Sequence, residues 1–303
     1  MVFFLTLVMT LSFVEVAFAT STITPASKIV DRVEYSTALN SVATIMMNWY
    51  GSLISVDAND TEFSNFKCIR KQWGEYRSQY PENITQILIT GTELLKLEGS
   101  GDYQFRVKSK IAYKHNNETI TQLLNETFVF KSTLLGQKDV PYIESISRDK
   151  STVTDNVNTT GFDISHYKVR EFTYAWLSYI DGISTFKSTM NTKAWLDKAT
   201  YSLKMGSEQL MGSIESTLEK KKLFLTKGGH LLHSLEVIKS DANTLVIDLI
   251  LEWKGTNKAG KPVIARIHQE IEVQIKTDKT WEVLSIKEEH LLPIIAPWMG
   301  LVC

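Results

Sequence analysis

The sequence predicts an α+β protein of two tandem cone-like domains, each with a long helix and a short helix packed on a curved antiparallel sheet. The first supporting observation is a strand pattern that occurs twice, 140 residues apart, as Phe105, Val107, Ser109, Ile111 and Tyr113 and again as Leu245, Ile247, Leu249, Leu251 and Trp253. Strict alternation places each set on one face of a strand. The second is an echo between Gly-Thr-Glu-Leu-Leu from Gly91 and Gly-Gly-His-Leu-Leu from Gly228. The third is an aromatic helical stripe in each half, with Trp176 following Trp49 by 127 residues. We interpret the three together as an internal duplication.

The size and composition of the chain agree with two folded domains. A length of 303 residues allows each half to bury its own core. Apolar and charged residues, at 43% and 22%, are in the range of folded proteins, which argues against a largely disordered chain. The net charge of −1 offers no basic field for nucleic acid, so we expect no nucleic-acid partner.

Residues 1–19 resemble a secretory signal peptide. An apolar run from Val2 to Val14 leads to Ala17-Phe18-Ala19, the small-x-small pattern of a cleavage site. The alternative, an anchoring helix, needs about 20 apolar residues, and this run is shorter. We therefore expect a secreted, extracellular protein that begins near Thr20 and has no transmembrane anchor.

Asparagine usage in the first half also favours export. Five residues head N-x-Ser/Thr sequons, all before position 160: Asn59, Asn83, Asn117, Asn125 and Asn158. A glycan needs exposure to water, so these sequons predict a glycosylated face on the first domain, although so short a motif also occurs by chance.

The chain has two cysteines, Cys68 and Cys303, which are too few for a disulfide scaffold. In an oxidising compartment they could pair and tie the C-terminus to the first domain. The other interpretation is a buried free Cys68 and a frayed terminal thiol, and both remain open. Neither has a ligand-like neighbour in sequence, so metal binding by cysteine is not expected.

The first domain is predicted over residues 31–148. A helix fits residues 33–54, because apolar side chains recur every three or four residues at Tyr35, Leu39, Val42, Met46, Trp49 and Leu53. A second helix is predicted over 62–76, followed by strands at 85–90, 93–98, 105–113, 124–131 and 142–147. The polar, aperiodic residues 149–167 have the composition of a linker.

The second domain is predicted over residues 168–290 in the same order. A long helix runs from Val169 to Phe186 and a second helix covers 192–205, followed by a polar stretch at 206–222. Strands are predicted at 223–226, 230–237, 244–253, 263–275 and 280–287. Residues 291–303 form an apolar C-terminal arm, which either packs on a sheet or clasps another domain or subunit.

This order of elements over residues 33–148 and 168–290 resembles the nuclear-transport-factor-like superfamily, whose cone fold is shared with ketosteroid isomerase and SnoaL-type polyketide cyclases. The resemblance implies an apolar pocket between the first helix and the concave sheet. In the second domain it directs attention to a candidate ligand-binding set: Trp176, Tyr179, His230, Trp253 and His268. Asp181 and Arg266 belong to the same region, and core packing is the alternative role for the aromatic residues.

The chemistry of these candidates argues against catalysis and against a metal site. Tyr179 and Asp181 are about 200° apart on an ideal helix, so both are not expected to face one pocket. The inward positions of strand 244–253 carry no acid, where an isomerase would place one. His230 and His233 are three apart on a predicted strand and should face opposite sides, which disfavours a shared metal. We therefore predict no catalytic residue, metal or cofactor.

The sequence favours a secreted, non-catalytic module that binds a small apolar ligand or an extracellular protein. The alternative is a small-molecule isomerase, dehydratase or hydrolase with its pocket in the second domain. A third interpretation is a structural duplication whose convex sheets pair into a homodimer.

Overall fold

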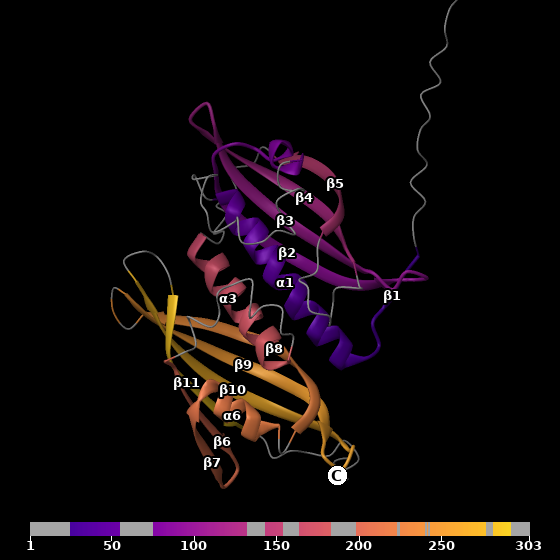
Figure 1. The fold of residues 1–303 in the computed structure, drawn as a ribbon. Helices are drawn as coiled ribbons and strands as arrows, with labels where there is room; N and C mark the ends of the chain where they lie inside the picture. Colours follow the sequence, from indigo (N-terminus) through magenta and orange to yellow (C-terminus); the bar gives the residue numbers. More distant parts are fainter. Residues whose placement is uncertain are drawn as a thin grey trace, which may run out of the picture.

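The computed structural model describes residues 25–54, 75–131, 143–153, 164–182, 198–222, 225–239, 241, 243–276 and 281–291. They form two curled sheets and three α-helices (Figure 1), as the predicted fold class requires. The first sheet has the order β1 (Ala26–Lys28), β2 (Ile84–Leu97), β3 (Tyr103–His115), β4 (Glu118–Phe130), β5 (Ile143–Val153), and every neighbouring pair is antiparallel. A 3₁₀ turn, η2 (Arg77–Gln79), precedes β2.

The second sheet has the order β7 (Glu208–Ser213), β6 (Thr200–Met205), β11 (Trp281–His290), β10 (Pro262–Ile275), β9 (Thr244–Asn257), β8 (Leu225–Lys239). Its strands pair antiparallel except β6 and β11, which are parallel. The short helix α6 (Ile214–Lys221) follows β7 and begins at Ser213, whose side chain accepts a hydrogen bond from the Ser216 amide.

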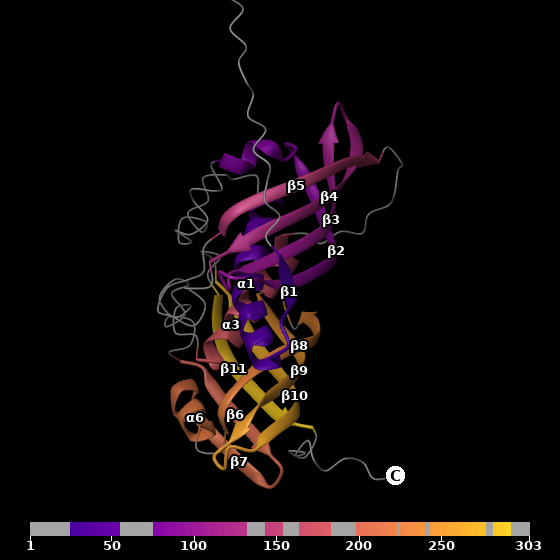
Figure 2. The same cartoon turned by 90° about the vertical axis from the view of Figure 1, so that its right-hand side faces the viewer.

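The long helices α1 (Arg32–Ile54) and α3 (Ile164–Ile180) lie side by side between the two sheets (Figures 1 and 2). Asp31 caps α1 by accepting hydrogen bonds from the amides of Val33 and Glu34 at 2.8 and 3.2 Å. The apolar stripe of α1 packs into the core of the first sheet and that of α3 into the core of the second. The two units of one chain therefore meet through their helices.

The repeated strands are confirmed as β3 and β9. All five alternating residues of β9 are buried, and those of β3 are buried up to Ile111, with Tyr113 partly buried against the same core. The glycine echo does not mark equivalent positions. Gly91 pairs with Lys108 on β3, and the residue 140 positions after Lys108 is Asp248 on β9. Gly228 does not pair with Asp248 but with Gly255.

Several predicted boundaries differ from the structure. The strands predicted at 85–90 and 93–98 are one strand, β2, and those predicted at 223–226 and 230–237 belong to one strand, β8. The helix predicted from Val169 to Phe186 is α3, which ends at Ile180. The helix predicted over 192–205 is wrong from residue 200 onward, because Thr200–Met205 is strand β6 with Tyr201 and Leu203 fully buried at a period of two. The stretch predicted as a linker contributes to two elements, since β5 extends to Val153 and α3 begins at Ile164. The polar residues of β5 are tolerated because β5 is an edge strand of its sheet.

Several predictions concern residues that the structure does not describe. These are the signal peptide at 1–19, most of the helix at 62–76, Cys68, Cys303, the sequons at Asn59 and Asn158, and the arm beyond Leu291. Among the described residues, the helices are too short or too polar to cross a lipid bilayer.

Candidate functional site

A cleft of about 1520 Å³ opens where α3 ends against the second sheet. Its walls come from α1, α3, α6, β8, β9 and β10, so both units contribute to it. Apolar surface is supplied by Tyr179, Leu218, Trp253 and Val263, and His230 lies among them. Charged residues also line the cleft, among them Arg32, Glu219 and Lys254, so it combines apolar surface with a polar border. Concave sites that are mostly apolar and carry some polar groups are the usual form of a small-molecule pocket.

Asp181 and His230 form a buried pair in this cleft. The Nδ1 atom of His230 lies 2.5 Å from Oδ1 of Asp181, and the backbone amide of His230 donates to Oδ2 of the same carboxylate at 3.0 Å. Both side chains are almost completely buried. The other ring nitrogen, Nε2 of His230, is buried and has no hydrogen-bond partner among the described residues. Since the carboxylate accepts hydrogen bonds, Nδ1 carries a proton, and a neutral ring then has a lone pair on Nε2.

Asp181 stands at the C-terminal end of α3, where its amide still donates to the carbonyl oxygen of Leu177 at 3.0 Å. The last helical residue is Ile180, and Gly182 has a φ of 85°, a left-handed conformation that glycine adopts without strain. Asp181 and Tyr179 both line the cleft. The prediction that they cannot share a pocket was wrong, because the cleft lies across the C-terminal end of α3 and both side chains border it.

Helix α1 of the first unit closes the site from the side. Nδ2 of Asn40 donates to the carbonyl oxygen of His230 at 2.8 Å and lies 3.4 Å from Oδ2 of Asp181. Two glycines on β8 make room for neighbouring groups, Gly229 for α1 and Gly228 for the ring of Trp253 on β9. A Cβ at Gly229 would lie 2.3 Å from Oγ of Ser36, and one at Gly228 would lie 2.3 Å from the ring of Trp253.

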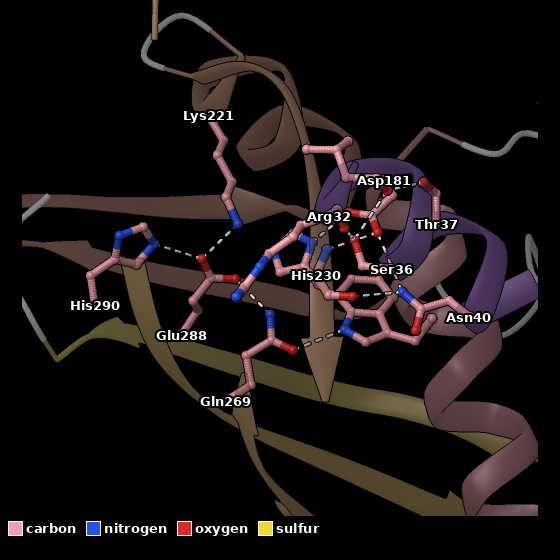
Figure 3. Close-up of polar contacts among 12 residues, drawn as sticks. Arg32, Ser36, Thr37, Asn40, Asp181, Lys221, His230, Gln269, Glu288 and His290 are labelled. Atoms are coloured by element: carbon pink, nitrogen blue, oxygen red, sulfur yellow. Dashed lines mark hydrogen bonds and ion pairs between the residues drawn. The ribbon is translucent and has the colours of Figure 1, made fainter. Parts of the chain in front are cut away.

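A second buried polar cluster surrounds Glu288 on β11 (Figure 3). Its Oε1 accepts from Nζ of Lys221 at 2.6 Å and from Nε2 of His290 at 3.0 Å. Its Oε2 accepts from the hydroxyl of Tyr201 and from Nε2 of Gln269, the latter at 2.6 Å. Gln269 in turn accepts from the indole of Trp176 at 3.0 Å.

The charge of Glu288 is set by this cluster. Burial alone would raise the pKa of the carboxyl, but the Lys221 ammonium and the His290 ring hold that pKa well below its ordinary value. Burial, together with the Glu288 charge, raises the pKa of the Tyr201 hydroxyl well above its ordinary value. Each Glu288 oxygen already accepts two hydrogen bonds, so this carboxylate orders its neighbours and has no free lone pair with which to take a proton.

The structure brings four of the five predicted ligand-binding residues to one end of the second unit. Tyr179, His230 and Trp253 line the cleft. Trp176 packs against Tyr179, and the centroids of the two rings are 5.9 Å apart. Whether they bind a ligand stays a prediction. His233 is exposed, as the strand spacing predicted.

His268 lies on the opposite face of the sheet. Its neighbours on β10, Ile267 and Gln269, are buried on the core side, so His268 and the exposed Arg266 point outward. There, Nε2 of His268 is 2.9 Å from Oδ2 of Asp248. Asp248, His268 and Glu270 offer three ligand atoms within 4.8 Å of one another, and Lys287 lies 3.5 Å from Glu270 as a counter-charge.

Glu288, Lys221, Gln269 and His290 are not among the residues predicted from the sequence. One signal was present, because Ile286, Glu288 and His290 alternate on one face of a strand whose apolar member is buried. For Lys221 no signal was available, since a charge run such as 220–222 normally lies in water.

The first unit has a similar buried cluster, centred on Glu126. Glu126 accepts from the hydroxyls of Tyr50 and Tyr80 at 2.8 and 2.6 Å and from Nε of Arg148 at 2.7 Å. Trp49 donates to the Tyr80 hydroxyl at 2.9 Å. The Arg148 guanidinium stacks 3.7 Å above the Tyr80 ring, so the cluster is filled by its own side chains.

No protein-family model and no curated protein matches the chain. Similar solved structures include a hexachlorocyclohexane dehydrochlorinase from Novosphingobium barchaimii, 12% identical over 44% of this chain and 91% of that chain, with a TM-score of 0.37. A ketosteroid isomerase-like protein from Erwinia carotovora is 16% identical over 33% of this chain and 78% of that chain, with a TM-score of 0.26. An NTF2-like protein from Rhodospirillum rubrum is 14% identical over 43% of this chain and 100% of that chain, with a TM-score of 0.31.

Proposed function

We propose that the second unit is a small-molecule lyase or isomerase in which His230 removes a proton from carbon. The observation that carries this proposal is that His230 lines the cleft while its Nε2 atom is buried and has no hydrogen-bond partner among the described residues, with Asp181 bound to the opposite ring nitrogen. A buried polar atom without a partner costs free energy, and among the atoms of this kind on the described residues only Nε2 of His230 belongs to a residue that lines the cleft. This proposal takes up the enzymatic alternative from the sequence in preference to the non-catalytic module.

Asp181 gives His230 the properties of a general base. By accepting from Nδ1 it fixes the tautomer that has its lone pair on Nε2, and its negative charge stabilises the imidazolium formed when the proton is taken. Because Asp181 also binds the backbone amide of His230, the ring and its peptide are oriented by one carboxylate.

The lining of the cleft indicates the class of substrate. Tyr179, Trp253 and Val263 present aromatic and aliphatic surface close to His230, which suits a small apolar or aromatic molecule with an acidic C–H bond. The same surface also suits simple ligand binding, and substitution of His230 distinguishes catalysis from binding alone.

A nitrobenzisoxazole is a suitable probe, because it is apolar and reacts by loss of a carbon-bound proton. The base takes the ring C–H proton, the C–H electron pair completes the nitrile, the N–O bond breaks, and a coloured cyanophenolate is released. Since a general base contributes roughly 100- to 10,000-fold, His230→Gln should lower the protein-catalysed rate by at least about 100-fold.

His268→Gln is the matched control. His268 also contacts an aspartate, but on the outer face of the sheet, so its loss should leave the rate unchanged. Equal rates for wild type and His230→Gln would refute the proposed base. If the probe still bound the cleft in that case, the ligand-binding function would be favoured.

We also propose that the protein is exported and glycosylated. Support comes from the exposure of the three described sequon residues, Asn83, Asn117 and Asn125. Protein secreted from eukaryotic cells should lose mass on treatment with an N-glycosidase. An unchanged mass would contradict the glycosylation.

A further inference from the structure

We infer that Asn40, on helix α1 of the first unit, is a positioning residue for His230, so that the second unit's catalytic pair is completed by the first unit. The inference rests on the proposed function of His230. It assigns a role in the site to a residue that is 190 positions away in sequence and belongs to the other copy of the duplication.

The contacts of Asn40 hold His230 from the side that Asp181 does not reach. Asp181 binds the ring and the backbone N–H of His230, and Asn40 donates to its backbone carbonyl at 2.8 Å. The same Asn40 nitrogen lies 3.4 Å from Asp181 (Figure 3). One amide group from α1 thus touches both members of the pair and fixes their relative position.

The surroundings of Asn40 limit its freedom to move. Its side chain is completely buried, and α1 lies directly on the backbone of β8 one turn earlier, where Ser36 occupies the space above Gly229. Close packing of a helix on a strand at a glycine gives a fixed helix position. The amide of Asn40 is therefore presented to His230 by a rigid contact between the two units.

Asn40 does not line the cleft, so it should not contact a bound substrate. Loss of an orienting residue then affects the chemical step more than substrate binding, and it lowers kcat while KM changes little. A residue with a merely structural role would change stability without this separation.

The test compares Asn40→Leu with Asn48→Leu in the full chain, using nitrobenzisoxazole turnover. Asn48 is a matched control because it is also a buried asparagine on α1, two turns further on, and it donates to Glu171 of α3 at 3.1 Å, away from the site. We expect Asn40→Leu to lower kcat by about 10- to 100-fold with KM nearly unchanged, because a misplacement of roughly 1 Å in an active site can cost about 100-fold. Asn48→Leu should keep the wild-type kcat.

Asn40→Ser, which retains a small polar group, replaces Asn40→Leu if the leucine variant does not fold. Equal kcat for the Asn40 and Asn48 variants, in folded protein, would overturn the inference while leaving the base assignment intact.

Histidine NMR distinguishes failure of the inference from failure of the proposed function. The His230 imidazole signals are identified by their absence in His230→Gln, and they should shift in the Asn40 variant but not in Asn48→Leu. Turnover that does not depend on His230 would reject the proposed function. Unchanged His230 signals in the Asn40 variant would reject the positioning role, whatever the turnover.

Discussion

Asn40 and Tyr167 occupy equivalent positions in the two long helices, 127 residues apart, as do Trp49 and Trp176. Each donates a hydrogen bond to a backbone carbonyl of the opposite sheet: Asn40 to His230 on β8 at 2.8 Å, and the Tyr167 hydroxyl to Ile87 on β2 at 3.1 Å. The contact between the units is therefore reciprocal. Only one of the two carbonyls belongs to a histidine, so the reciprocal contacts differ in the residue that they hold.

Tyr167→Phe should lower the stability of the protein without changing the rate of the proposed reaction. It removes the hydrogen bond to the buried Ile87 carbonyl and should lower the free energy of unfolding by about 1–3 kcal/mol, the cost of an unpaired buried acceptor. The nitrobenzisoxazole rate should stay at the wild-type value. Urea unfolding and the rate assay measure the two quantities, and a large loss of rate would show that the two contacts are not independent.

Gly229→Ala should push α1 away from β8. The new Cβ would lie 2.3 Å from Oγ of Ser36, so we expect a loss of about 1–3 kcal/mol from overpacking. Ser36→Ala in the same chain removes that oxygen and leaves the new Cβ 3.5 Å from Cβ of residue 36 and 3.3 Å from the Val33 carbonyl oxygen, so it should relieve most of the clash. Thermal unfolding of the two single variants and the double variant forms a cycle. If the stability changes of the two single variants simply add in the double variant, the predicted clash is contradicted.

The repeated architecture could be predicted from the sequence because the spacing of apolar residues along each element shows which face is buried. Ile247, Leu249 and Leu251 alternate, and the stripe containing Trp49 recurs at helical spacing, so the elements could be assigned before their packing was known. The hairpin β6–β7 was missed because it is short and its buried residues, Tyr201 and Leu203, lie in a polar context that also fits a helix end.

The candidate site was predicted less completely than the fold. His230 could be singled out, but its partner could not, because the position of Asp181 depends on where α3 ends. The contribution of Asn40 depends on how two units dock, which no local pattern encodes. Glu288 is a buried carboxylate whose neighbours come from three other elements, and such clusters are defined only by tertiary contacts.

Lys221→Met tests the charge balance around Glu288. The lysine ammonium is almost buried and lies 2.6 Å from the carboxylate, so its removal leaves a buried negative charge without its nearest cation. We expect a loss of about 3–5 kcal/mol at neutral pH, measured by urea unfolding. Lys221→Met combined with Glu288→Gln should recover part of that loss. A double variant less stable than Lys221→Met would contradict a charge effect.

The lowered pKa of Glu288 predicts a stability that falls in acid. Burial opposes ionisation, but Lys221 and His290 keep the folded-state pKa well below the ordinary 4.5, so the unfolded chain takes up the proton first as the pH falls. The stabilisation is therefore fully present above the unfolded-state pKa and disappears as the pH falls through the folded-state value.

Glu288→Gln, which does not titrate, should show a shallower loss of unfolding free energy below about pH 5 than wild type. Glu34 and Glu289, whose pKa values are also lowered, are present in both proteins, so the difference between the two curves isolates Glu288. Parallel curves would contradict the ionised, paired state of this carboxylate.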